Sequence, residues 1–303
     1  MIKILFLRNL KALYPEIDAY INYFNNKDKF SAFDSLKLGE DYDLKEFDVI
    51  WEIKGIGGVK LQNKVLVHDY ASLSLPPFPK IKNKLKGIIN PTPSLRVFLN
   101  ETVKSGFNFI NETPYCFRDM GIDEKFINIA KQDKEYEFVY VGAISKKRKI
   151  DKFLRNYESS KFGKIILIGP VDDEIYNSFK NNKDITFTGR VDYKEVPSIA
   201  SKGMYGLNLI PNSYPYNLQT STKILEYLAL GLKIITTDYS WVRGFEEKHD
   251  CSFYKVDYDT PIDLKKLQGF DFKSNFKAES FLWDSVIKKS GIEDEILKLT
   301  NLV

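Results

Sequence analysis

The sequence has few cysteines and lacks any long apolar run. Its two cysteines, Cys116 and Cys251, are far apart and do not have the spacing of metal ligands. This pattern argues against a disulfide framework and makes a reducing compartment the default. No run of about 18 apolar residues, the length that a membrane span requires, occurs in the chain. The apolar start, MIKILFL, stops at Arg8 and does not have the architecture of a signal peptide. We therefore expect a cytoplasmic protein, either soluble or held peripherally on the inner face of the cell membrane.

Strong charge of one sign and a dinucleotide-binding glycine motif are also missing. The formal net charge of +4 on 303 residues is mild. It suits an acidic ligand or an anionic membrane surface and gives no reason to expect nucleic acid as a partner. Gly55, Gly57 and Gly58 do not form G-x-G-x-x-G, which argues against a Rossmann dehydrogenase. The length fits two domains.

Short apolar runs alternate with polar or helical stretches in the first half of the chain. They occupy residues 2–7, 47–53 and 64–68, with weaker runs at 87–89 and 96–99. Runs of this length are typical of buried strands, and the alternation is typical of an open α/β sheet. We therefore predict a sheet domain in this half.

His68 and Asp69 stand at the end of one predicted strand, residues 64–67. Ligands of open parallel sheets bind beyond the carboxyl ends of the strands. A histidine or a carboxylate at such a place could act as general base toward a hydroxyl nucleophile. Both residues are therefore candidate catalytic residues. The alternative is a strand-end histidine satisfied by local hydrogen bonds.

Residues 73–86 join apolar side chains to a basic run. Prolines lie among Leu73, Leu75 and Phe78, and they prevent a regular helix until about Lys80. Four lysines then alternate with other residues, at positions 80, 82, 84 and 86. Such a stretch could lie on an anionic membrane, where each lysine contributes on the order of 1 kcal/mol. An ordinary surface loop followed by a basic helix is the alternative.

Three predicted strands in the second half each end at a glycine. The strands are residues 137–141, 164–168 and 185–188, and the glycines are Gly142, Gly169 and Gly189. A glycine lets the backbone approach a ligand closely, and the cations of residues 145–149, SKKRK, could hold phosphates beside it. The alternative for this basic run is a solvated turn.

Residues 205–238 form the most informative stretch. An apolar strand, 205–210, leads through a polar loop to a helical run that starts at Ser221-Thr222-Lys223 and stops at Gly231, and a second strand ends at Asp238. Such units build parallel sheets. A helix start with hydroxyls and free amides suits an anion. Glu226 places a charge inside this mostly apolar helix.

These features resemble the nucleotide-sugar glycosyltransferases with the GT-B fold, above all the large group with an E-x(7)-E signature in the donor domain. Tyr140-Val141-Gly142 with Arg148-Lys149 looks like the basic loop that holds the donor diphosphate. Residues 185–191 look like the segment beside the nucleotide base, and 222–238 are similar to the most recognisable block of the family. Leu218 occupies the position of the first signature glutamate, which is therefore absent here.

The resemblance implies an α/β protein of two Rossmann-like domains facing each other across a cleft. The acceptor-binding domain would be residues 1–125, and the nucleotide-sugar donor domain would be residues 126–280. Residues 281–303 would form a C-terminal helix that returns toward the first domain.

The resemblance also implies the roles of the donor-site residues. Glu226 would bind the ribose hydroxyls, while Ser221 and Thr222 would face the diphosphate. The full predicted donor-binding set is Gly142, Arg148, Lys149, Arg190, Val191, Ser221, Thr222, Lys223 and Glu226. No metal or other cofactor is implied, because fixed cations would stabilise the leaving diphosphate. For Glu226 the alternative is a surface pair with Lys223, three residues earlier on the same helix.

The predicted activity is transfer of a sugar from a nucleoside-diphosphate sugar to a hydroxyl of a glycan or lipid-linked acceptor, in cell-surface polysaccharide or glycoconjugate synthesis. An inverting enzyme would use His68 or Asp69 as base, and a retaining enzyme would use the leaving phosphate. Two alternatives stay open: a GT-B nucleotide-sugar epimerase, and a non-catalytic nucleotide-sugar-binding or scaffold subunit of a glycan assembly complex.

Overall fold

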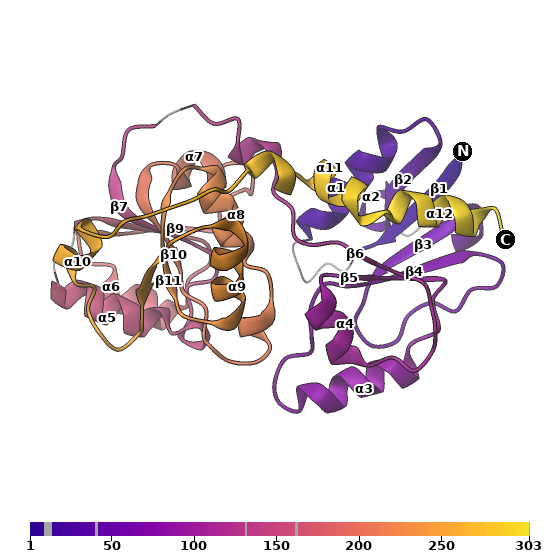
Figure 1. Cartoon of the computed structure of the whole chain (residues 1–303), viewed down its shortest axis with the longest axis horizontal. Helices are drawn as coiled ribbons and strands as arrows, with labels where there is room; N and C mark the ends of the chain where they lie inside the picture. The colour runs from indigo at the N-terminus through magenta and orange to yellow at the C-terminus, as the bar shows by residue number, and fades with distance from the viewer. Residues whose placement is uncertain (9–13, 40–41, 131, 161–162, 303) are drawn as a thin grey trace. The chain divides into compact units, whose positions relative to one another are not determined.

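The chain forms two compact units in a computed structural model that describes residues 1–8, 14–39, 42–130, 132–160 and 163–302 (Figure 1). The first unit combines residues 1–121 with residues 280–303, and the second unit is residues 122–279. Each unit contains one six-stranded sheet whose neighbouring strands are all parallel. The predicted α/β fold with two Rossmann-like domains is therefore confirmed.

The sheet of the first unit has the strand order β2-β1-β3-β4-β5-β6. Its strands are β1 Ile2–Leu7, β2 Phe30–Asp34, β3 Val49–Ile53, β4 Val65–Tyr70, β5 Leu95–Phe98 and β6 Tyr115–Phe117. Its helices are α1 Pro15–Asn25, α2 Ser35–Leu38, α3 Pro79–Ile89, α4 Glu101–Phe107, α11 Trp283–Ser290 and α12 Ile292–Thr300, with the short 3₁₀ turn η1 Leu44–Glu46. The strand predicted at residues 87–89 is wrong, because these residues form the last turn of α3.

The main core of the first unit lies between one face of its sheet and three helices from the two ends of the chain. Ile4, Phe6 and Val67 of the sheet are buried against side chains of α1, α11 and α12. Ile287 and Ile296 of the last two helices are completely buried there. The end of the chain is thus part of the hydrophobic core of the first unit.

The sheet of the second unit has the strand order β12-β11-β10-β7-β8-β9. Its strands are β7 Tyr136–Val141, β8 Ile165–Ile168, β9 Ile185–Gly189, β10 Gly203–Asn208, β11 Lys233–Thr237 and β12 Tyr254–Val256. Its helices are α5 Ile150–Ser160, α6 Asp173–Phe179, α7 Val196–Ala200, α8 Thr222–Ala229, α9 Ser240–His249 and α10 Leu264–Gln268. The 3₁₀ turns are η2 Glu124–Phe126, η3 Lys146–Arg148, η4 Tyr216–Leu218 and η5 Ala278–Phe281, the last at the boundary of the units.

The strand order of the second unit reverses between β7 and β10. The chain builds β7, β8 and β9 in one direction and then returns to place β10 on the other side of β7. The loops that follow β7 and β10 therefore leave the sheet in opposite directions, and in open parallel sheets this reversal, at the carboxyl ends of the strands, is where ligands bind. Gly142 and the loop before α8 lie at this point.

Within the described residues, no helix is both long enough and apolar enough to cross a membrane.

Candidate functional site

Two glycines shape the carboxyl ends of β7 and β8. Gly142 has φ +135°, and a Cβ atom there would lie 3.0 Å from Cε of Lys223. Gly169 has φ +138°, and a Cβ atom there would lie 2.3 Å from the carbonyl oxygen of Gly142. A side chain at either position would be strained by the positive φ and would lie too close to these atoms. The two strand ends and the side chain of Lys223 thus meet at one place.

The start of α8 is anchored to the ends of β10 and β11 by a buried polar network. Ser221 Oγ donates to Asn208 Oδ1 at 2.7 Å. Asn208 Nδ2 donates to Thr236 Oγ1 and to the hydroxyl of Tyr239, each at 2.9 Å. The Ser221 side chain does not cap the helix, and the N–H of Ile224 is bonded to the carbonyl of Ser221 at 3.1 Å, so the N–H groups of Thr222 and Lys223 are left for another acceptor. An anion at this helix start would meet those groups and the positive end of the helix dipole.

Lys223 supplies a half-buried positive charge beside that helix start. Its Nζ lies 5.9 Å from the ring centroid of Tyr140, and Arg148 of η3 approaches the same tyrosine. Burial and the charge of Arg148 lower the pKa of Lys223 to about 8, against the opposite effect of Glu226. In the part of the chain that the structure describes, no carboxylate lies within ion-pair distance of Lys223. An anionic ligand would therefore be favoured here.

Glu226 lies one turn further along α8 and faces the loop after β9. Its side chain is buried, and its Oε1 accepts a hydrogen bond of 2.8 Å from the hydroxyl of Tyr193. Burial raises the pKa of Glu226 to about 7, although Tyr193 and Lys223 both act to lower it. The partner of Glu226 is therefore a tyrosine from another segment and not Lys223. Tyr193 in turn packs against Phe126, with ring centroids 5.8 Å apart.

The structure thus brings together some of the predicted donor-site residues. Gly142, Arg148, Ser221, Lys223 and Glu226 gather around the first turns of α8, at the β7/β10 reversal. Thr222 is half-buried at the first position of the helix. The binding roles assigned to these residues stay predictions.

The other members of the set lie nearer to solvent. Arg190 is exposed and Val191 is half-buried, in the loop that leads to Tyr193. Lys149 is also exposed, and its Nζ lies 5.4 Å from the ring centroid of Tyr258. Leu218 lies in η4, which packs against α9.

His68 and Asp69, in the first unit, project to opposite faces of β4, as successive residues of a strand do. His68 is completely buried. Its Nε2 lies 3.2 Å from Glu52 Oε2, and its Nδ1 lies 3.3 Å from the hydroxyl of Tyr70. Burial lowers the pKa of His68, although Glu52 acts in the opposite direction, so the ring is neutral at pH 7.

Asp69 is held in a buried ion pair on the other face of β4. Its two oxygens accept from Nε and Nη2 of Arg118, at 3.2 and 3.1 Å. Its Oδ2 also accepts from the hydroxyl of Tyr20 at 3.3 Å. The contacts of Asp69 are those of a residue that stabilises the core. Catalytic roles for His68 and Asp69 stay predictions.

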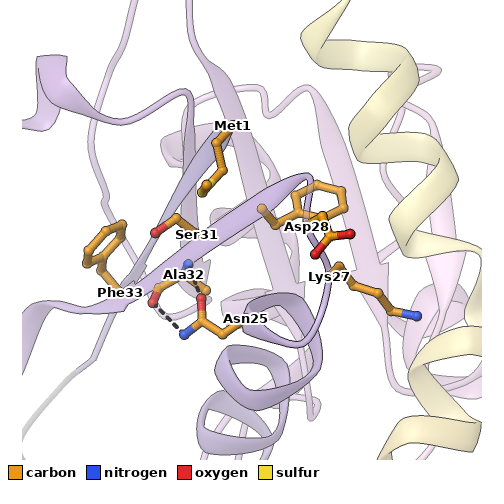
Figure 2. Close-up of a pocket in the computed structure, with 8 residues that line it drawn as sticks. Met1, Asn25, Lys27, Asp28, Ser31, Ala32 and Phe33 are labelled. Carbon is orange, nitrogen blue, oxygen red and sulfur yellow. Dashed lines mark hydrogen bonds between the residues drawn. The ribbon is translucent and has the colours of Figure 1, made fainter.

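A shallow pocket lies at the β2 edge of the first unit (Figure 2). Its eight lining residues include Lys27, Asp28 and Asn25, and the amide of Asn25 is bonded to both backbone groups of Ala32. The predicted site residues do not line this pocket. The polar side chain of Asn25 serves to join α1 to β2.

Two residues of the site, Tyr193 and Asn208, were not predicted from the sequence, and Tyr140 was named only as part of the strand before Gly142. Tyr140 contacts Lys223 and Tyr193 contacts Glu226 because segments distant in sequence fold together. Asn208 did carry a signal, since it is a polar residue inside the apolar run of residues 205–210. A buried amide in a strand needs partners, and such a residue often organises a polar network.

No family profile and no curated protein sequence matches the chain. Several solved structures are similar to the chain. AviGT4, a glycosyltransferase involved in avilamycin A biosynthesis, is 12% identical with a TM-score of 0.63, and the match covers 100% of this chain and 99% of that one. Sucrose-phosphate synthase from Thermosynechococcus elongatus is 11% identical with a TM-score of 0.63, covering 100% and 98%. The UDP-GlcNAc 2-epimerase from Neisseria meningitidis, bound to UDP-GlcNAc, is 11% identical with a TM-score of 0.58, covering 96% and 100%.

The chain therefore has the GT-B fold, which glycosyltransferases and UDP-GlcNAc 2-epimerases share. The predicted resemblance is confirmed at the level of the fold. Identities of 11 and 12% carry no residue roles with them, so activity has to be argued from the site.

Proposed function

We propose that the protein is a glycosyltransferase that moves a sugar from a nucleoside-diphosphate sugar to a hydroxyl group. The observation that carries this proposal is the start of α8. It combines the uncapped N–H groups of Thr222 and Lys223, the half-buried side chain of Lys223 and a glycine-lined strand end at the point where the sheet order reverses. Each of these features favours an anion, and a diphosphate could contact all three.

The donor would lie across the reversal point of the second unit. The diphosphate would accept hydrogen bonds from the first turn of α8 and lie between Lys223 and Arg148. The carboxylate of Glu226 would accept from the ribose hydroxyls, with Tyr193 fixing its second oxygen. The base would then lie near Arg190 and Val191, in the loop after β9. This arrangement uses the half-buried Lys223 and the buried Glu226 of α8 without any change of fold.

Catalysis would come mainly from stabilising the leaving group. As the bond from the sugar to the diphosphate breaks, negative charge grows on the diphosphate. Lys223, Arg148 and the N-terminus of α8 are fixed in place before the reaction, which is the condition under which such stabilisation is strongest. Because the cations are protein side chains, we propose that the enzyme needs no metal ion.

The acceptor would bind to the first unit, and we propose a glycan or a lipid-linked glycan used in cell-surface polysaccharide or glycoconjugate synthesis. The proton of its hydroxyl must pass either to a base or to the leaving phosphate. Neutral His68 is the better base of the two predicted residues, since Asp69 is engaged by Arg118. The anomeric configuration of the product would distinguish the two routes.

A nucleotide-sugar epimerase is the second candidate, because a UDP-GlcNAc 2-epimerase covers nearly the whole chain. It would use the same diphosphate site but would convert its nucleotide sugar without an acceptor. A third outcome, binding without turnover, would indicate the scaffold subunit.

A thermal-shift screen against UDP-, GDP-, ADP-, CMP- and dTDP-linked sugars tests the proposed site. We expect one nucleotide to raise the melting temperature of the wild type, and Glu226→Ala and Lys223→Ala to abolish the shift. Glu247→Ala and Lys248→Ala, on the exposed side of α9, are matched controls and should keep it. If the wild type responds to none of these nucleotides, or the two site variants respond normally, the donor site is wrong.

A further inference from the structure

Helix α3 of the first unit buries a polar side chain and exposes its apolar side chains. Among its eleven residues, Pro79 to Ile89, the one buried residue is the polar Asn83. The side chain of Asn83 accepts from the backbone of Ser74 at 2.9 Å and donates to the carbonyl of Gly106 at 3.3 Å. A surface helix of a soluble protein normally buries its apolar stripe and exposes its polar side chains. In α3 the polar side is fixed to the protein.

The apolar stripe of α3 faces solvent. Ile81, Leu85, Ile88 and Ile89 stand at positions i, i+4, i+7 and i+8, which is one face of a helix. All four are exposed, and Ile88 is 70% exposed. Phe78, directly before the helix, continues the stripe and is 71% exposed. A continuous apolar surface of this kind marks an interaction site more often than chance exposure.

Two loops add apolar residues near the same end of the helix. The loop of Ile56 is tied to the residue after α3, because Asn90 bonds both Gly55 and Gly57. Phe109 lies against Gly87 of α3, and the next residue, Ile110, is 98% exposed. Figure 1 shows α3 beside α4, with the chain of residues 108–114 continuing from α4 toward β6. The surface therefore extends beyond one helix.

The charge of α3 and of the chain that flanks it is of one sign. From residue 70 to residue 100 the chain contains no aspartate or glutamate, and its cations are the four lysines of α3 and the buried Arg96. Lys80 and Lys84 are exposed along one side of the apolar stripe. Lys82 and Lys86 are half-buried along the other, where Lys82 Nζ bonds the carbonyl of Leu75 and Lys86 lies 5.5 Å from the ring centroid of Phe107. Apolar side chains bordered by lysines match the interface of an anionic bilayer.

We propose that α3 docks the first unit on an anionic lipid surface. The helix lies in the plane of the membrane, with Phe78, Ile81 and Ile88 inserted among the acyl chains and the lysines beside the headgroups. Asn83 anchors the opposite side of the helix to the protein through its hydrogen bonds with Ser74 and Gly106. The apolar face is therefore exposed while the first unit stays folded. The proposal is independent of the reaction that the protein catalyses, since it uses none of the residues of the donor site.

Cosedimentation of the full chain with lipid vesicles tests the proposal. We expect binding to vesicles of equimolar phosphatidylcholine and phosphatidylglycerol, weak binding to pure phosphatidylcholine, and loss of binding as salt is raised. Ile81→Ser with Ile88→Ser, and separately the change of all four α3 lysines to Gln, should each weaken binding by about tenfold or more. The matched control changes Lys265, Lys266, Lys288 and Lys289 to Gln; it removes the same charge elsewhere and should bind as the wild type does.

Three results would overturn the proposal. The first is equal binding by the wild type and both α3 variants, provided that circular dichroism shows all of them folded. The second is no binding of the wild type to the anionic vesicles. The third is wild-type self-association that disappears in the Ile81→Ser, Ile88→Ser variant without any lipid binding, which would assign the surface to a second copy of the chain. Nucleotide binding is measured separately, so failure of the donor site does not affect this test.

Discussion

The hydroxyl of Tyr193 donates to Oε1 of Glu226 at 2.8 Å, and this contact joins the loop after β9 to the second turn of α8. It also keeps Glu226 more acidic than burial alone would make it. Tyr193→Phe should therefore raise the pKa of Glu226 above its value of about 7 and leave less carboxylate at neutral pH. We expect nucleotide affinity to fall by about tenfold at pH 7, in line with the loss of one hydrogen bond to a charged group, and to recover partly at pH 8. Calorimetry at both pH values checks this; an equal loss at both would show that Tyr193 acts only through packing.

Glu226→Gln should separate charge from shape. The amide fits the same space, but it lacks the negative charge that makes the hydrogen bonds from ribose hydroxyls strong. We expect weaker nucleotide binding than in the wild type and no change of affinity as pH crosses 7, where the wild-type carboxyl group titrates. An affinity of the variant that still changes across pH 7 would show that another group titrates there.

Lys223→Met should stabilise the unliganded protein while it abolishes diphosphate binding. The folded state lowers the pKa of Lys223 from 10.5 to about 8, so between these values the unfolded chain binds more protons. The charged lysine therefore costs stability below pH 8, and this cost disappears as pH rises toward 10.5. We expect the free energy of unfolding of the variant to exceed that of the wild type by about 1–3 kcal/mol at pH 7, and this difference should shrink above pH 8. Urea unfolding across pH measures it, with Lys248→Met as the control.

The two ionisable groups of α8 predict a maximum in the pH dependence of nucleotide binding. Glu226 is a carboxylate above about pH 7, and Lys223 is charged below about pH 8. A ligand that needs both charges should bind best between these values. Binding should release protons below pH 7 and take up protons above pH 8, which calorimetry in buffers of different ionisation enthalpy detects. Proton uptake on both sides would contradict the assignment.

Gly142→Ala should damage both stability and nucleotide binding. Its φ of +135° strains any side chain, and the new Cβ would lie 3.0 Å from Lys223 Cε. We expect the free energy of unfolding to fall by about 1–3 kcal/mol. We also expect the nucleotide-induced thermal shift to be lost. Gly244→Ala in α9 is the control, since nothing lies within 4 Å of its Cβ position and alanine favours helix.

Asp69→Asn tests whether Asp69 supports the core or the chemistry. Removing its charge leaves the buried guanidinium of Arg118 without its main partner, and breaking such a pair costs on the order of 3–5 kcal/mol. We expect a lower melting temperature and a normal turnover rate in the fraction that remains folded. Normal stability with a lost rate would instead make Asp69 the base.

The fold was predictable where the sequence repeats one signal. Each of the runs 137–141, 164–168 and 185–188 is apolar and is followed by a glycine, and each forms a strand at the predicted place. Strands β2 and β6 were not predicted, because β2 alternates buried and half-buried residues and β6 has only three residues. Residues 87–89 were predicted to form a strand because they make up a short apolar run, which suggests burial. In the structure they belong to α3 and are exposed.

The site was predictable only in part. A glutamate inside an apolar helix and a glycine at a strand end are visible in sequence, and both lie where they were expected. Their partners depend on contacts between distant loops, so nothing local identified Tyr193. His68 and Asp69 project to opposite faces of their strand because of its two-residue period, and their roles as alternative bases stay predictions.

The buried positions of Ile287 and Ile296 have a consequence for how the protein is made. The second unit is one continuous segment, so all of its sheet is available once residue 279 has left the ribosome. The first unit is synthesised earlier, yet its core stays open until the last helices emerge to cover it. During translation the later unit can therefore complete its fold before the earlier one, and the exposed face of the first sheet is the surface that chaperones would have to protect in the meantime.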